Sequence, residues 1–76
     1  MTGRLPRVTG TEVVRALQRS GWEVVRVRGS HHILRHPDQP GMPIVPCHAG
    51  HTLAPGTLKS VLRDAGLTSE QLKSLL

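Results

Sequence analysis

Aromatic side chains are nearly missing from this sequence of 76 residues, which has one tryptophan, no phenylalanine and no tyrosine. Valine, leucine and isoleucine must therefore build the core, and we expect Trp22 to be buried with them. Domains that bind single-stranded nucleic acid by stacking its bases need several exposed aromatic side chains. The composition therefore argues against a base-stacking platform.

Cysteine is equally scarce, and long apolar runs are lacking. The single cysteine, Cys47, cannot form an internal disulfide and fits a reducing compartment. No stretch is long and apolar enough to span a bilayer, and no charged segment followed by an apolar run marks a leader. We therefore expect a cytoplasmic protein without a membrane partner.

Acidic residues are the third shortage. The chain has five Asp and Glu against ten Lys and Arg, and a formal net charge of +5 with its five histidines counted as neutral. This excess favours a polyanionic partner, nucleic acid first and an acidic protein second. A chain of this length has room for one helix layer on one sheet. We expect residues 1–76 to form a single domain, with residues 1–8 as an entry segment.

A first helix is expected soon after the entry segment. Thr9 and Glu12 have the spacing of a capping box, and apolar residues follow at helical spacing. Gly21 then supplies a left-handed stop. These signals predict a helix over residues 10–20.

Two more helices are expected at the other end of the chain. Pro55 suits the first position of a helix that ends at Gly66, with Leu67 packing back on it. Thr68 and Gln71 form a second capping box, which predicts a short last helix.

Three strands are expected between these helices, joined by turns that are rich in glycine and proline. In the first strand, alternation places Val25 and Val27 on one face and Arg26 and Arg28 on the other. Prolines in the third strand suit an edge position. The strands are predicted over residues 22–28, 31–36 and 42–47. The aliphatic residues assigned to the core are Val14, Leu17, Val25, Val27, Leu58, Val61 and Leu62.

This order of elements predicts an α+β fold. A three-stranded antiparallel sheet cannot bury both faces by itself, so the helices must cover one face and leave the other, with its basic edge, open. The order α-β-β-β-α is also that of double-stranded-RNA-binding domains.

The residues best suited to chemistry lie at the turn between the first two strands, in Gly29-Ser30-His31-His32. Imidazole, with an unperturbed pKa of about 6.5, can donate or accept a proton near neutral pH. His32 shares a strand face with Leu34, whereas His31 shares the other face with Ile33, so alternation alone does not decide which histidine is exposed. We expect Ile33 to be buried and His32 to be exposed. A purely structural pair, one ring bonded to the backbone and one solvated, is the alternative.

Several motifs occur in an order that resembles the HicA family of bacterial toxins. They are Gly-Ser-His-His at residues 29–32, Pro-Cys-His at residues 46–48, and the helical stretch from Leu53 through Pro55-Gly56-Thr57-Leu58 to Ala65-Gly66-Leu67. The likeness extends from Thr9 to Leu76. Each motif alone is a weak signal, but together and in this order they are specific.

The resemblance implies a double-stranded-RNA-binding-like fold, ribonuclease activity on messenger RNA, and neutralisation by a HicB antitoxin. It also implies that one histidine of the strand motif is catalytic. In this chain the counterpart is His32, and His31 is the fallback.

RNA carries its own nucleophile, the 2′-hydroxyl, so the protein has to supply only a base, an acid and positive charge. We expect His32 to act as the base or the acid, without a metal or other cofactor. The second acid–base group stays open between His31, His48, water and the substrate. Residues expected to hold RNA are Arg26, Arg28, Ser30 and Arg35.

Two other functions are compatible with the sequence, and each predicts a different behaviour. A non-catalytic RNA-binding module of the same fold would bind RNA with a steep salt dependence and leave it intact. A metal-dependent regulatory domain would use Cys47, His48 and His51, joined by His36, although four clear ligands in paired motifs are lacking. We expect Cys47 to be core and His48 to be a loop residue near the active face.

Overall fold

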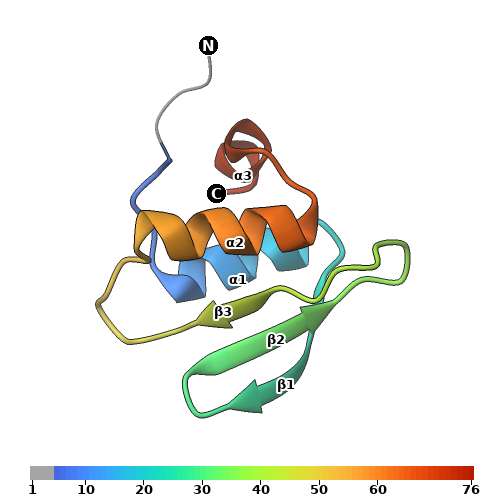
Figure 1. The fold of residues 1–76 in the computed structure, drawn as a ribbon, viewed down its shortest axis with the longest axis horizontal. Helices are drawn as coiled ribbons and strands as arrows, with labels where there is room; N and C mark the ends of the chain where they lie inside the picture. The colour runs from blue at the N-terminus through green and yellow to red at the C-terminus, as the bar shows by residue number, and fades with distance from the viewer. Residues whose placement is uncertain (1–4) are drawn as a thin grey trace.

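The computed structural model describes residues 5–76 (Figure 1). It confirms the predicted type and order of every element, and most predicted ends lie within one or two residues of the observed ones. The third strand differs most in length, because it has three residues where six were expected. The elements are α1 (Gly10–Arg19), β1 (Glu23–Arg28), β2 (His31–Arg35), β3 (Ile44–Pro46), α2 (Pro55–Ala65) and α3 (Ser69–Leu75).

The three strands form one antiparallel sheet in the order β1-β2-β3, so β2 lies in the centre. Pro46 belongs to β3, and Pro43 comes just before it. Proline cannot donate a ladder hydrogen bond and is tolerated at an edge, which agrees with the expected place of this strand.

The helices gather on one side of the sheet (Figure 1), and α1 packs against α3, β1 and β3. The guanidinium of Arg19 donates a hydrogen bond of 2.6 Å to the carbonyl oxygen of Leu75, which joins α1 to α3. The core lies between the helices and the sheet and includes Trp22, as predicted. Its other buried members are Val8, Val13, Val14, Ala16, Leu17, Leu34, Val45, Leu58, Val61, Leu62, Ala65 and Leu72.

Both predicted capping boxes are present. At the start of α1, the Thr9 hydroxyl accepts the Glu12 N–H at 3.2 Å and the Glu12 carboxylate accepts the Thr9 N–H at 2.8 Å. Thr68 and Gln71 repeat the arrangement at α3, with distances of 3.1 and 2.8 Å. These local bonds satisfy backbone groups that a helix start leaves free, which is why the sequence locates the starts well.

The entry segment is partly docked on the domain. Val8 is buried, and its carbonyl oxygen accepts the Leu53 N–H at 2.8 Å. A bridge between Thr9 and Thr52 continues this pairing. Residues 1–4 of the predicted entry segment lie outside the described residues.

Two glycines allow close contacts that the sequence does not reveal. A Cβ atom on Gly10 would overlap the carbonyl oxygen of Pro46, and one on Gly41 would overlap the carbonyl oxygen of Asp64. The first contact joins the start of α1 to the end of β3. The second joins the turn before β3 to the last turn of α2.

The predicted burial of Val25 and Val27 is wrong. Their side chains are 53% and 55% exposed, respectively. The reason is a bulge in β1: Val24 pairs with Leu34 and Arg26 pairs with Ile33, which leaves Val25 as an extra residue and changes the alternation after it. Val27 returns to the face of the core, but at the hairpin end of an edge strand, where it stays uncovered.

The predicted orientation of β2 is also wrong. Leu34 is fully buried, with 0% of its surface exposed, whereas Ile33 is only half-buried. Leu34 lies opposite Val24, under the helix layer, and so decides which face of β2 points inward. His32 shares this inner face and is half-buried rather than exposed.

Candidate functional site

The candidate site lies where the β1–β2 turn meets the loop after β3. Gly29 makes the turn with a φ of +59°, a left-handed conformation that suits glycine. The carbonyl oxygen of Ser30 then accepts the Cys47 N–H at 2.7 Å. This bond holds the start of the loop at residues 47–54 against the turn, so two segments far apart in the sequence share one end of the sheet.

His32 extends from this end on the inner face, between Val27 and Val45 in the strand pairing. Its Nδ1 atom lies 3.4 Å from the carbonyl oxygen of Ser30. A carbonyl oxygen can only accept, so this long hydrogen bond requires the proton on Nδ1. Neutral His32 then carries its lone pair on Nε2, which is the form that a general base needs.

His48 approaches the same serine from the loop. Its Nε2 atom lies 3.3 Å from the Ser30 hydroxyl oxygen. The side chain is exposed, as expected for a loop residue. Ser30 therefore contacts both imidazoles, one through its carbonyl oxygen and one through its hydroxyl. Sequence spacing could not show this, because Ser30 and His48 are 18 positions apart.

His31 and the arginines lie on the other side of the sheet. Residues directly opposite in an antiparallel pair share a face, and Arg28 pairs with His31 while Arg26 pairs with Ile33. Arg35 follows Ile33 by two positions and is on that face too. The strands that carry the arginines are neighbours, as expected, but the arginines accompany His31 rather than His32.

We call this second side the open face, defined by Glu23, Arg26, Arg28, His31, Ile33, Arg35, Ile44 and Pro46. It combines positive charge with uncovered aliphatic side chains, and Ile44 is 49% exposed. Between residues 5 and 76, the ion pair present joins Lys73 to Glu70 in α3, so these arginines form no ion pair within this range. The open face thus combines exposed aliphatic side chains with arginines that form no ion pair.

His36 is at the opposite end of the sheet and has a structural role. Its Nε2 lies 3.1 Å from the Ser20 carbonyl oxygen, and its Nδ1 accepts the Asp38 N–H at 3.0 Å. Its ring packs edge-on against Trp22, with centroids 5.3 Å apart. His36 therefore cannot join Cys47 and His48 around a metal ion.

The other suggested metal ligands are close to one another without forming a cluster. The rings of His48 and His51 have centroids 6.4 Å apart. Within residues 5–76, no group of three or more His, Cys, Asp or Glu side chains is arranged to hold a metal ion.

Cys47 is half-buried against the core and just outside β3. Its thiol lies 3.7 Å from the carbonyl oxygen of Val45, to which it can donate. Burial raises the pKa of the Cys47 thiol above its usual value, because desolvation disfavours the thiolate. A protonated thiol is a poor nucleophile, so Cys47 contributes packing rather than chemistry.

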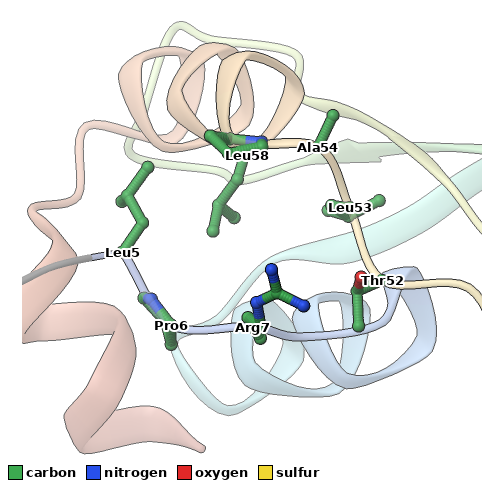
Figure 2. A pocket seen from close by; sticks show the side chains of 8 residues that line it. Leu5, Pro6, Arg7, Thr52, Leu53, Ala54 and Leu58 are labelled. Atoms are coloured by element: carbon green, nitrogen blue, oxygen red, sulfur yellow. The ribbon is translucent and has the colours of Figure 1, made fainter.

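A separate hollow of about 270 Å³ lies between the entry segment and the start of α2 (Figure 2). Arg7 and Leu58 point into it from opposite sides. Its wall combines polar and apolar side chains, and neither His32 nor His48 lines it. The residues that line it are Leu5, Pro6, Arg7, Thr52, Leu53, Ala54, Pro55 and Leu58.

The fold and the site define a small α-β-β-β-α domain with two imidazoles on one serine at the hairpin end of its sheet. Residues 10–67 match the family described as the HicA toxin of bacterial toxin–antitoxin systems. The chain belongs to this family, and it is therefore a toxin of a toxin–antitoxin system. No curated protein matches the chain in sequence.

The match extends from the first residue of α1 to the residue after the cap of α2. It thus includes the whole sheet and the loop that carries His48, whereas α3 follows it. None of the helices in the described part of the chain is long and apolar enough to cross a membrane.

Proposed function

We propose that this toxin is an endoribonuclease that cleaves messenger RNA without a metal ion, with His32 as the general base. The observation that supports the proposal best is the contact of His32 Nδ1 with the Ser30 carbonyl oxygen at 3.4 Å. It directs the unprotonated Nε2 away from the backbone. His32 is also half-buried, so its side chain is partly enclosed and partly accessible to a substrate.

The reaction uses the 2′-hydroxyl of the RNA as the nucleophile. His32 Nε2 takes the 2′ proton while the 2′ oxygen attacks the adjacent phosphorus. The bond from phosphorus to the 5′ oxygen then breaks, and that oxygen receives a proton from an acid. The products are a 2′,3′-cyclic phosphate and a 5′-hydroxyl, and a positioned base contributes about 10²–10⁴-fold to such a rate.

Positive charge near the phosphate would stabilise the transition state. Arg28 is the best placed of the expected RNA contacts, because it comes two positions before Ser30 at the hairpin end. Ser30 contributes a hydroxyl at the same end. Arg26 and Arg35 lie further along the open face, and we assign them to the antitoxin rather than to the cleaved phosphate.

The partner that silences the toxin is, in this proposal, a HicB-type antitoxin. The open face offers it unpaired arginines around half-buried Ile33 and exposed Ile44, and apolar residues with arginine are typical of protein interfaces. An acidic antitoxin surface would complement this charge. From the open face it would reach over the hairpin end and cover His32. We expect the complex to form in the cytoplasm.

The test is a cleavage assay with end-labelled RNA in excess EDTA. We expect wild-type protein to cleave and His32→Ala to lose about 10²–10⁴-fold in rate. His31→Ala is the matched control, because it removes the same ring from the neighbouring position on the opposite face. It should keep most of the activity, and circular dichroism should show that both variants are folded.

Other results would contradict the proposal in distinct ways. A 5′-phosphate on the product would rule out attack by the 2′-hydroxyl. Loss of activity in His31→Ala but not in His32→Ala would move the base to the open face. Intact RNA with wild-type protein, together with salt-sensitive binding, would identify a non-catalytic RNA-binding module.

A further inference from the structure

We infer that His48 is the general acid that protonates the leaving 5′ oxygen, in a pair with His32. This inference rests on the proposed ribonuclease activity and adds the group that completes its proton transfers. The observation behind it is the hydrogen bond between His48 Nε2 and the Ser30 hydroxyl, at 3.3 Å. Through Ser30, the loop imidazole and the strand imidazole are held at the same end of the sheet.

The two contacts with Ser30 differ in a way that separates the roles. The carbonyl oxygen facing His32 only accepts, which favours one neutral tautomer with a free lone pair. The hydroxyl facing His48 can both donate and accept, so the bond survives when His48 gains or loses a proton. A general acid must change its protonation state during the reaction, and the His48 environment allows this without a structural change.

The remaining titratable side chains near the hairpin end are less suitable. His31 lies on the open face, opposite Arg28 in the strand pairing. His51 follows His48 in the loop, but its ring contacts His48 and not Ser30. The Cys47 thiol is turned to the carbonyl oxygen of Val45. In the part of the chain that the structure describes, His48 is thus the acid–base group that shares Ser30 with His32.

These two residues account for both proton transfers of the reaction. His32 Nε2 receives the proton of the 2′-hydroxyl as the new bond to phosphorus forms. Protonated His48 gives its proton to the 5′ oxygen as the bond from phosphorus to that oxygen breaks. After product release, exchange with water deprotonates His32 and reprotonates His48, so no oxidant, reductant or metal is consumed.

The experiment compares two leaving groups in one RNA sequence. After the cleavage site has been mapped with wild-type protein, an oligonucleotide is made with sulfur in place of the bridging 5′ oxygen at that site. A thiolate leaves without being protonated, so a general acid is no longer needed. We expect His48→Ala to lose about 10²–10⁴-fold on the oxygen substrate and less than about tenfold on the sulfur substrate. His32→Ala should lose activity on both.

Two control variants separate proton transfer from positioning. His48→Gln keeps a side chain that can bond to the Ser30 hydroxyl but cannot transfer a proton, so it should be as impaired as His48→Ala on the oxygen substrate. His51→Ala removes a ring from the same loop without touching Ser30 and should behave as wild type. Thermal unfolding of each variant shows that the fold is kept.

Each outcome of this experiment supports or overturns the acid role of His48. Equal losses of His48→Ala on both substrates, or recovery of activity in His48→Gln, would overturn the acid role and leave His48 as a positioning residue. Unchanged cleavage by His48→Ala would overturn the inference while the ribonuclease proposal stands. Failure of wild-type protein to cleave either RNA would refute the ribonuclease proposal itself.

Discussion

The two faces of the sheet carry adjacent histidines in opposite surroundings. His32 lies on the face of Leu34 and Val45, beside Ser30 and close to the loop that carries His48. His31 lies on the open face, among arginines and half-exposed isoleucines. The comparison shows how one strand can place two identical side chains in different surroundings. The inner face holds one ring against a backbone carbonyl oxygen, whereas the outer face exposes charge and apolar surface.

The largest effect that tests this comparison concerns folding rather than activity. Leu34→Ala removes a fully buried side chain and should lower the free energy of unfolding by about 2–5 kcal/mol. Ile33→Ala, one position away on the open face, should cost only about 1 kcal/mol, because Ile33 is half-buried. Urea unfolding of both variants measures the difference. Equal losses would mean that the faces of β2 are not as described.

A somewhat smaller loss of stability is expected where the start of α1 contacts the end of β3, beside the candidate site. Gly10→Ala should cost about 1–3 kcal/mol, since its Cβ atom would overlap the Pro46 carbonyl oxygen and push α1 away from β3. Gly56→Ala is the matched control: nothing lies within 4 Å of its added Cβ, and it should be neutral or stabilising by about 0.4–1 kcal/mol. Thermal unfolding measures both. A neutral Gly10→Ala would contradict the contact.

Binding of RNA separates the hairpin end of the open face, beside the candidate site, from the rest of that face. In a His32→Ala background, Arg28→Ala should reduce the slope of log K against log salt by about 0.7, the value for one phosphate contact to a single strand. Arg35→Ala should leave this slope unchanged, because Arg35 lies at the end of the open face away from the hairpin, whereas Arg28 lies at the hairpin end. Fluorescence anisotropy at several salt concentrations provides the slopes. An equal reduction in both variants would show that RNA crosses the open face.

The smallest effect concerns the thiol beside the candidate site. Because burial raises the pKa of Cys47, less thiolate is present at a given pH than for a free cysteine. Folded protein should therefore react with iodoacetamide more slowly than unfolded protein at pH 8, and the difference should shrink as the pH rises through the raised pKa. Mass spectrometry follows the alkylation. Faster reaction in the folded state would indicate an activated thiolate instead.

The sequence predicted the features that depend on neighbouring residues. Thr9 with Glu12 and Thr68 with Gln71 marked two helix starts, and Gly66, with a φ of +69°, marked the end of α2. These signals act within one helical turn, so no knowledge of the tertiary structure is needed. The fold class followed from the order of the elements.

The faces of the strands could not be predicted in the same way. The bulge at Val25 changes the alternation in β1, and nothing in a run of valines and arginines marks the extra residue. In β2, Ile33 and Leu34 are equally apolar, so the choice between faces depends on which of them meets Val24 and the helix layer. Both errors arise from contacts between distant segments.

The candidate site was predicted in part for a similar reason. The Gly-Ser-His-His turn was found from its residues, and His48 was recognised as one of several possible partners. The bond from Ser30 to Cys47 and the contact of Ser30 with His48 join segments that the sequence keeps apart. The distribution of His31 and His32 between two faces could not be settled before the register was known.

The bulge in β1 also affects how the toxin behaves at high concentration. An outer strand with exposed valines would normally be a template on which a second chain could pair and aggregate. In β1, the extra residue at Val25 interrupts the regular spacing of backbone donors and acceptors, and Arg26 and Arg28 add like charge along the strand. Pairing of a second toxin molecule along β1 is thereby disfavoured.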